Sequence, residues 1–166
     1  MDFRLKRASE DDLPFIMAAE RGEGFDALVG QWEEARHRAA FQDGSHAYFI
    51  GYDGGTPIGF VMLRFWDSPE KVTLIRRVAM VAPGLGHGRV LLSAVIERIF
   101  SETQAHRVQI GLFPDNIRAR RAYDAVGFVA EGISRGSAFF HGVHRDELVM
   151  ALLRPDWQAR VPAADG

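Results

Sequence analysis

The chain of 166 residues contains no cysteine. This absence excludes disulfide bonds, zinc sites built on thiolates and catalysis by a cysteine nucleophile. The sequence also lacks an apolar run long enough to span a bilayer, and Met1 to Arg4 do not begin a signal peptide. We therefore expect a cytoplasmic protein without a membrane partner.

Two further kinds of site have little support. No dense stripe of Lys and Arg with interleaved aromatic residues is present, so we expect no nucleic-acid partner. His141 and His144 lie close together in the sequence, but no third ligand follows at a useful spacing. The sequence therefore predicts no metal site.

The overall composition is that of an ordinary globular domain, with 47% hydrophobic and 25% charged residues. We expect a single domain over residues 1–154. Residues 155–166 form the remaining tail, which we expect to be poorly anchored.

Hydrophobic periodicity predicts strands that alternate with helices. The expected strands cover residues 3–8, 46–52, 58–66, 72–81, 107–113, 128–140 and 146–153. The expected helices cover a segment beginning at Ser9 or Asp12, then residues 28–41, 89–101 and 116–126. In the second helix, Trp32, Ala35 and Ala39 fall on one face. These elements predict a mixed α/β fold, with a mostly antiparallel sheet of about seven strands flanked by about four helices.

A glycine-rich turn follows the strand over residues 72–81. Gly84, Gly86 and Gly88 alternate there, so no side chain keeps a ligand away from the backbone. The helix that begins near Arg89 directs free N–H groups and a positive dipole of roughly half a charge toward the same place. This arrangement favours a pyrophosphate.

The familiar nucleotide motifs do not fit this turn. No Gly-Lys-Ser/Thr follows the glycines, and G-x-G-x-G is not the dinucleotide motif G-x-G-x-x-G. A nucleotide-dependent oxidoreductase is therefore disfavoured. On the turn alone, a tight strand-to-helix connection that binds no ligand stays open.

Two more segments extend the pattern. Asn116 to Phe128 fits N-x-x-A-x-x-x-Y-x-x-x-G-F. Phe140 to Met150 reads F-x-G-x-x-x-D-x-x-x-M, which resembles the ending F-x-x-G-x-x-x-D-x-x-x-M. Together with V-x-P-G-x-G-x-G at Val81 to Gly88, they resemble the GCN5-related N-acetyltransferase (GNAT) superfamily, in the branch of spermidine and ribosomal-protein acetyltransferases. The family usually has Gln or Arg where this chain has Pro83, which leaves the backbone of the turn unaffected.

The resemblance implies a function and a cofactor site. It implies direct transfer of an acetyl group from acetyl-CoA to a primary amine in a ternary complex, without a metal. It also implies a cleft where the strands before the glycine turn and before Asn116 splay apart, although a normally paired strand remains the alternative. The implied cofactor-binding residues are Ala79, Met80, Val81, Gly84, Leu85, Gly86, His87, Gly88, Arg89, Asn116 and Tyr123.

Tyr123 is the residue to which the resemblance gives a catalytic role. A phenol with a pKa near 10 is protonated at neutral pH and can hydrogen-bond to the thiolate of departing CoA, whose pKa is near 8.5. Ala119, Ala122 and Val126 share its helical face, so packing in the core is the alternative. Asn116 can orient the cofactor and cap its own helix. Arg118, Arg120 and Arg121 either steer the CoA phosphates or form a solvated helix face.

The residue that deprotonates the amine is not evident. Several family members use a glutamate on the strand before the turn, but Val72 to Arg77 contain none. A water chain is one alternative. The other candidates are Glu33, Glu34, Glu70, His46 and His141.

Charge is distributed unevenly along the chain. Residues 1–70 hold seven Lys and Arg against thirteen Asp and Glu, whereas residues 71–166 hold thirteen against nine. This asymmetry predicts an anionic cofactor on the second half and a cationic amine, small or in a peptide or protein, on the first, unless both are ordinary solvated faces. The acidic residues expected to face that amine are Glu20, Glu23, Asp26, Glu33, Glu34 and Asp43.

Two questions stay open at the level of sequence. A non-catalytic sensor that binds acyl-CoA would keep the glycine turn without turnover, although Tyr123 argues against it. The sequence also leaves open a homodimer.

Overall fold

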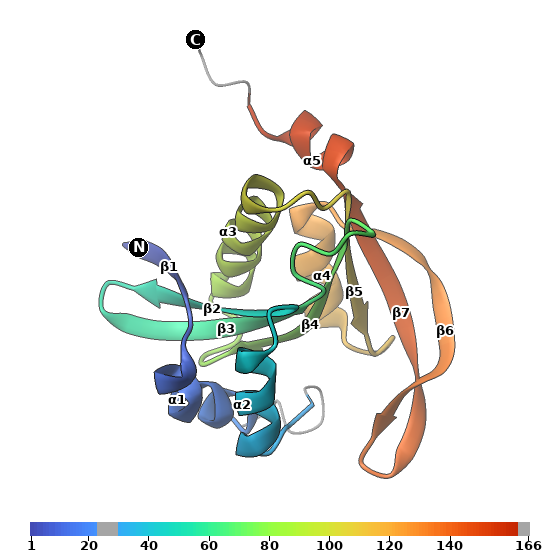
Figure 1. Cartoon of the computed structure of the whole chain (residues 1–166). Coiled ribbons are helices and arrows are strands. Elements are labelled where there is room, and N and C mark those ends of the chain that lie inside the picture. Colours follow the sequence, from blue (N-terminus) through green and yellow to red (C-terminus); the bar gives the residue numbers. More distant parts are fainter. Residues whose placement is uncertain (23–29, 163–166) are drawn as a thin grey trace.

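The computed structural model describes residues 1–22 and 30–162 (Figure 1). They form seven strands, five α-helices and one short 3-10 helix. The strands are β1 (Phe3–Arg7), β2 (His46–Asp53), β3 (Thr56–Arg64), β4 (Val72–Met80), β5 (Arg107–Leu112), β6 (Val129–Phe140) and β7 (Val143–Leu153). The helices are η1 (Glu10–Asp12), α1 (Leu13–Glu20), α2 (Glu34–Gln42), α3 (His87–Glu102), α4 (Ile117–Val126) and α5 (Arg154–Arg160).

All seven strands belong to one sheet, in the order β1-β2-β3-β4-β5-β7-β6. Every neighbouring pair is antiparallel except β4 and β5, which run parallel and are connected through α3. The mixed, mostly antiparallel sheet predicted from the sequence is therefore confirmed. The parallel pair is the place where a ligand-binding crevice is expected in such a sheet.

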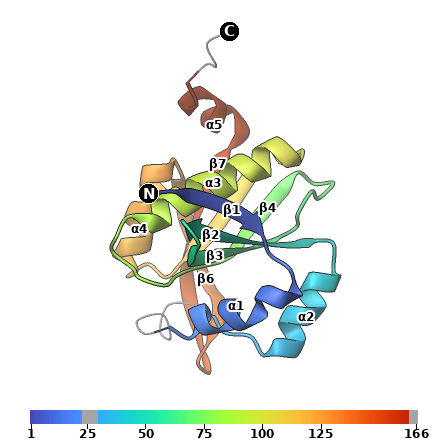
Figure 2. The same ribbon diagram turned by 90° about the vertical axis from the view of Figure 1, so that its left-hand side faces the viewer.

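Helices cover both faces of the sheet, and each face has its own hydrophobic core. Figures 1 and 2 show α3 and α4 on one face, and α1 and α2 on the other. Phe49, Val95 and Ile110 belong to the first core, and Ile16 and Phe60 belong to the second. The alternation of side chains along β2 and β3 supplies apolar groups to both faces, which explains why these strands are buried throughout their middle.

A β-bulge in β4 changes which face its residues occupy. Met62 on β3 is opposite Arg77, but the next residue, Leu63, is opposite Ile75, so Arg76 has no partner on β3. Because one extra residue reverses the alternation, Ile75 joins the core under α3 while Arg77 turns to the face covered by α1 and α2.

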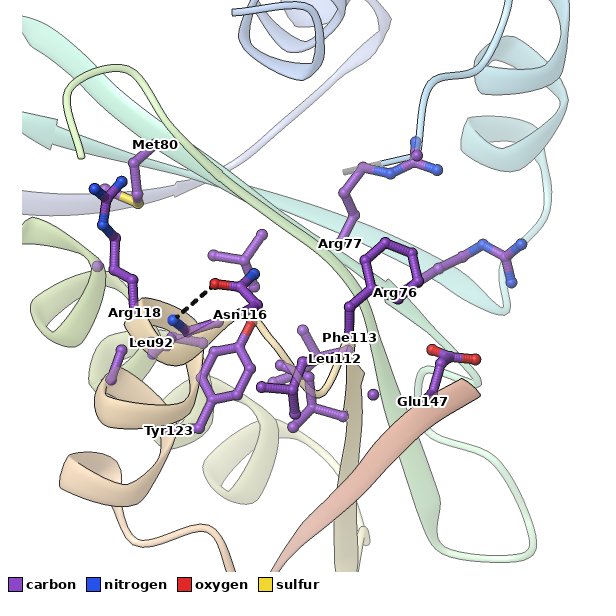
Figure 3. A pocket seen from close by; sticks show the side chains of 18 of the residues that line it. Arg76, Arg77, Met80, Leu92, Leu112, Phe113, Asn116, Arg118, Tyr123 and Glu147 are labelled. Carbon is purple, nitrogen blue, oxygen red and sulfur yellow. Dashed lines mark hydrogen bonds between the residues drawn. The ribbon is translucent and has the colours of Figure 1, made fainter. Parts of the chain in front are cut away.

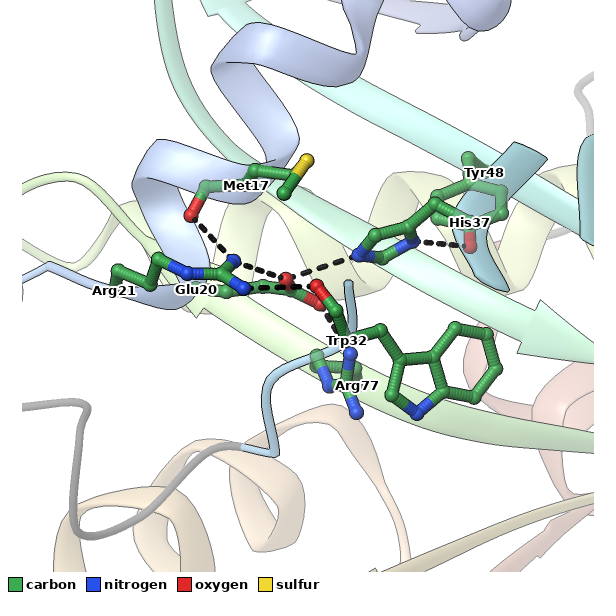
Figure 4. Close-up of polar contacts among 7 residues, drawn as sticks. All are labelled: Met17, Glu20, Arg21, Trp32, His37, Tyr48 and Arg77. Carbon is green, nitrogen blue, oxygen red and sulfur yellow. Dashed lines mark hydrogen bonds and ion pairs between the residues drawn. The ribbon is translucent and has the colours of Figure 1, made fainter. Parts of the chain in front are cut away.

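Arg77 reaches a buried polar network on that face (Figure 4). The Glu20 carboxylate is fully buried and accepts from Arg77 through Oε1 and from Nε2 of His37 through Oε2, the latter at 2.9 Å. Burial raises the pKa of Tyr48, so its hydroxyl keeps its proton and can donate to Nδ1 of His37 at 2.8 Å. Arg21 adds an ion pair to Glu20 at 3.2 Å. The network joins α1, α2, β2 and β4.

The second predicted helix differs most from the structure. Helix α2 begins at Glu34, residues 30–33 are not helical, and residues 28–29 lie outside the described residues. The predicted stripe is wrong, because α2 buries His37 and Ala40 and exposes Ala35 and Ala39. Hydrophobic periodicity cannot identify a face whose central buried residue is a hydrogen-bonded histidine. Trp32 is buried, but from the segment that precedes α2.

Smaller differences concern element boundaries. Helix α3 begins two residues earlier than predicted, at His87. Strand β7 begins at Val143 rather than Asp146, because His141 and Gly142 both have positive φ angles, of 50° and 77°, and close a two-residue turn.

The tail expected to be poorly anchored begins with α5. Trp157 packs on Phe100 with ring centroids 5.0 Å apart, and Arg160 donates to the carbonyl of Ala125 at 3.1 Å. Arg154 also donates to three carbonyl groups, one in the last turns of α3 and two in the α3–β5 connection. Residues 154–160 are therefore fixed to the domain. None of the helices in the described residues is long and apolar enough to cross a bilayer.

We expect Glu20→Ala to lower the free energy of unfolding by about 3–5 kcal/mol, because it leaves the Arg77 guanidinium buried without its counter-ion. Urea denaturation measures the change. Glu34→Ala, which breaks an exposed ion pair with Arg38, is the matched control and should have a much smaller effect. Equal losses for the two variants would contradict a structural role for the Glu20 network.

Candidate active site

A large cleft opens where β4 and β5 stop pairing. The two strands pair in parallel from Val72 and Arg107 as far as Ile75 and Ile110, and then diverge. The cleft between them has a volume of about 1630 Å³. A pocket for one drug-sized ligand usually measures about 300–1,000 Å³, so this cleft has room for two substrates.

The glycine turn forms one end of the cleft. Gly84 and Gly86 have φ angles of 89° and 78°, which side-chain-bearing residues adopt at a cost, and a Cβ on either would meet no atom within 4 Å. Gly86 is the N-cap of α3, so the N–H groups of His87, Gly88 and Arg89 are the free donors of its first turn. The turn therefore offers an open, electropositive backbone surface to an anion.

The edge of β4 beyond Ile75 forms a wall of the cleft. The N–H of Val81 donates to the carbonyl of Ile58 at 2.9 Å, and Ala79 is opposite Phe60 on β3. Hydrogen-bonded and non-hydrogen-bonded pairs alternate along antiparallel strands. The backbone N–H and C=O groups of Val78 and Met80 therefore point away from β3 and toward the gap. The amide of Val81, a residue that the family resemblance places among those that bind the cofactor, is thus occupied by β3. A ligand amide can pair with Val78 and Met80.

Helix α4 forms the opposite wall (Figure 3). Asn116 is its N-cap, and its Oδ1 accepts from the N–H of Ala119 at 3.2 Å. The Tyr123 ring points from α4 into the cleft beside Leu112 and is only 8% exposed. Burial raises the pKa of Tyr123, so its hydroxyl stays protonated and can act as a donor.

The structure gathers most of the predicted cofactor residues around this cleft. Ala79, Val81 and Leu85 are not among the residues that line it. Those that do line it are Met80, Gly84, Gly86, His87, Gly88, Arg89, Asn116 and Tyr123.

The three arginines of α4 divide into two groups. Arg118 and Arg121 line the cleft, where their charges can attract phosphate groups. Arg120 is directed along the helix surface and contacts Asp124 at 3.2 Å. Arg120 therefore fits the solvated helix face, whereas Arg118 and Arg121 are placed where they could contact phosphates.

Sequence reasoning missed Glu147, which lies on β7 over the mouth of the splay. Its Oε1 accepts from the Ser137 hydroxyl at 2.8 Å. Its Oε2 would lie 2.5 Å from a Cβ on Gly111, so the missing side chain at Gly111 makes room for the carboxylate. Gly111 is the first β5 residue beyond the last β4–β5 pair. The sequence alone could not place Glu147 at this position, because its position depends on the register between β5 and β7.

Most of the earlier base candidates lie elsewhere. Glu33 and His141 line the cleft. Glu34 pairs with Arg38, His46 contacts Asp43 at 3.2 Å, and Glu70 accepts from the Ser68 hydroxyl at 2.8 Å. Glu147 is the additional carboxylate placed at the splay.

The predicted acidic wall is largely absent. Glu20 is buried in its network, while Glu34 and Asp43 make local ion pairs. Glu23 and Asp26 lie outside the described residues. Glu33 alone of the four described acidic residues lines the cleft, whose described lining holds six arginines and three carboxylates. No group of three His, Asp or Glu side chains suited to a metal ion occurs within residues 1–22 and 30–162.

A sequence model of the Acetyltransferase (GNAT) family matches residues 10–128, which is most of the chain. The chain belongs to the GNAT family. Its glycine turn and α4 both lie in the matched region, whereas the lining residues of β6 and β7, Glu147 among them, lie beyond it.

Relatives with assigned names agree. The chain is 37% identical to the probable N-acetyltransferase YjcK of Bacillus subtilis over 62 residues, which span 37% of this chain and about a third (34%) of that protein. It is 27% identical over 134 residues to the putative ribosomal N-acetyltransferase YdaF of the same organism, covering 80% of this chain and 70% of that one.

Solved GNAT structures share the fold. Spermidine N-acetyltransferase of Vibrio cholerae, in complex with CoA and spermine, has a TM-score of 0.81 at 21% identity, covering 95% of this chain and 98% of that one. The ribosomal-protein-S5-alanine acetyltransferase of Vibrio fischeri has a TM-score of 0.79 at 16% identity, covering 95% and 96%. At these identities the similarity concerns the fold.

Proposed function

We propose that this protein is an N-acetyltransferase that moves an acetyl group from acetyl-CoA to a primary amine in a ternary complex. One observation carries the proposal. A single cleft contains the open glycine turn, the unpaired edge of β4 and the Tyr123 side chain. The turn suits a pyrophosphate, the edge suits the amides of pantetheine, and Tyr123 suits a leaving thiolate. The amine-specific names of the relatives and of the solved structures support the same class of reaction.

Two side chains of the protein, Tyr123 and Glu147, take part in the proposed reaction. The amine nitrogen attacks the thioester carbonyl carbon, the C–S bond breaks, and CoA leaves as a thiolate. Tyr123 hydrogen-bonds to that thiolate, because a phenol whose pKa is raised does not give up its proton fully to a thiolate with a pKa near 8.5. Glu147 attracts the ammonium form, which loses one proton to solvent to give the nucleophilic amine. Glu147 then accepts the second proton from the nitrogen as the N–C bond forms.

The test of the activity is release of free CoA thiol from acetyl-CoA in the presence of pooled primary amines. Thiol release that depends on amine supports the transferase. Tight binding of acetyl-CoA without any thiol release would instead identify a non-catalytic sensor, and absence of binding would contradict the cleft assignment itself.

We expect Gly86→Glu to abolish acetyl-CoA binding, because it adds a like charge and bulk where the phosphates dock. Calorimetry measures the affinity. Gly54→Glu is the matched control, since Gly54 also has a positive φ angle, of 60°, and open space around its Cβ, but lies in the β2–β3 turn. Unchanged affinity in a folded Gly86→Glu protein would remove the glycine turn from the site.

We expect Tyr123→Phe to keep acetyl-CoA affinity within a few-fold and to slow acetyl transfer by about ten- to a thousandfold, since it loses one hydrogen bond to developing negative charge. Rapid-quench measurement of a single turnover isolates that step. Tyr52→Phe removes the same atom from a half-buried tyrosine that does not line the cleft, and should have no effect. A parent-like single-turnover rate in Tyr123→Phe would make Tyr123 a packing residue.

We expect Glu147→Gln to lower kcat/KM by about a hundredfold or more, as loss of a general base does. Gly111→Ala should also lower kcat/KM, because its methyl group would displace the Glu147 carboxylate without removing the negative charge. Glu131→Gln is the control, since Glu131 on β6 pairs with Arg107 of β5 and does not line the cleft. If Glu147→Gln kept kcat/KM within twofold of the parent, Glu147 would not be the base, and a water chain would be the alternative.

A further inference from the structure

The end of the cleft opposite the glycine turn carries an unusual charge for a protein that acts on amines. This end is lined by residues of the segment before α2, of α2 itself and of the bulge in β4. Its cations are Arg36, Arg76 and Arg77, and its carboxylates are Glu33 and Glu147. Since the turn at the other end receives the cofactor phosphates in the function proposed above, this end is left for the acceptor.

All three of these arginines lie around the Trp32 ring, with the guanidinium carbon of Arg77 5.2 Å from its centroid. The guanidinium carbon of Arg36 lies 4.0 Å from the ring centroid of Trp32, and that of Arg76 lies 5.1 Å from it. Trp32 is buried, so it holds both guanidiniums at a fixed surface. Arg76 is the bulged residue of β4. It has no partner on β3, and a bulge changes the direction of the side chain it carries.

The charges of Arg36 and Arg76 are not neutralised within the described residues. Arg77 has its own counter-ion in Glu20, but neither Arg36 nor Arg76 forms an ion pair with a described carboxylate. Burial lowers the pKa of Arg76, and the charges of Arg77, Arg36 and Arg64 lower it further, against one opposing contribution from Glu147. An anion bound beside Arg36 and Arg76, in addition to the Glu147 carboxylate, would offset the repulsion between the guanidiniums.

The cofactor does not account for this pair. Arg89 and Arg118 lie toward the glycine turn and α4, where the phosphates are expected. Figure 3 shows Arg118 beside Met80 at one side of the cleft, and Arg76 with Glu147 at the other, beyond Phe113. Tyr123 and Leu112 lie between these two sides (Figure 3), and the proposed function places the leaving thiolate at Tyr123.

We propose that the acceptor of this protein is a small primary amine that also carries an anionic group, a carboxylate or a phosphate, which Arg36 and Arg76 bind. This inference rests on the proposed function. The planar guanidinium fork matches either anion with two parallel hydrogen bonds. The amine then lies near Glu147, and the two charges of the acceptor meet opposite charges of the cleft. A polyamine would place extra positive charge against Arg36 and Arg76, so it is a poor acceptor.

A panel of matched acceptors tests the proposal on the intact protein. It contains ω-amino carboxylates of three to six carbons, the corresponding ω-amino amides, aminoalkyl phosphonates of similar length, and spermidine. We expect kcat/KM for the best anionic acceptor to exceed that of its neutral amide by at least about tenfold. The carboxylate and phosphonate series show which anion is preferred, and the dependence on length reports the separation of amine and anion. Equal use of acids and amides, or preference for spermidine, would overturn the proposal.

Single variants test the two arginines. Arg76→Gln and Arg36→Gln should each raise KM for the anionic acceptor about tenfold or more, leave turnover of the neutral amide nearly unchanged and so remove the preference. Arg76→Lys keeps the charge without the fork and should recover part of the loss. Arg64→Gln is the control. Arg64 is exposed and its charge contributes to lowering the pKa of Arg76, but it does not line the cleft.

Acetyl-CoA affinity separates this proposal from the proposed function. Calorimetry should give the parent value for Arg36→Gln and Arg76→Gln, since neither residue belongs to the cofactor end. Weakened acetyl-CoA binding in either variant would assign these arginines to the cofactor and overturn the proposal while leaving the transferase intact. No thiol release with any acceptor, at parent-like affinity, would instead contradict the transferase.

Discussion

Two parallel strands that stop pairing part-way impose the main constraint on this molecule. Backbone N–H and C=O groups inside a protein need partners, yet β4 and β5 leave theirs open beyond Ile75 and Ile110. Such an edge is stable only when it faces water or a ligand that completes the ladder. The cleft opens from that divergence, and the glycine turn and Tyr123 both line it.

The bulge at Arg76 links the divergence to the charge of the site. It reverses the alternation of β4, which sends Arg77 into the buried network with Glu20 and leaves Arg76 in the cleft. The buried glutamate thus compensates one of two adjacent arginines and leaves the other available. Glu20, an acidic residue of the N-terminal half, therefore neutralises an arginine of the cleft lining and does not itself line the cleft.

The sequence predicted what local patterns determine. Alternation identified the strands, and the three glycines before α3 identified the turn that the structure shows at the end of the cleft. His37 was missed because a buried polar side chain interrupts hydrophobic periodicity, and its partners Glu20 and Tyr48 are remote in sequence. Glu147 and Arg76 were missed because their positions depend on register, which pairing between strands decides.

The contacts of Arg154 give α3 a further property. Its guanidinium donates to the carbonyls of Phe100, Thr103 and Ala105, at 2.8, 3.0 and 2.8 Å, at the C-terminal end of α3 and just beyond it. A helix has partial charges of opposite sign at its two ends, of roughly half a charge each. Because a cation offsets the negative pole, while the first turn of α3 contains no acidic residue, the positive pole is left unbalanced. The unopposed positive pole of α3 therefore lies at the glycine turn, where it attracts an anion over the short range on which a helix end acts.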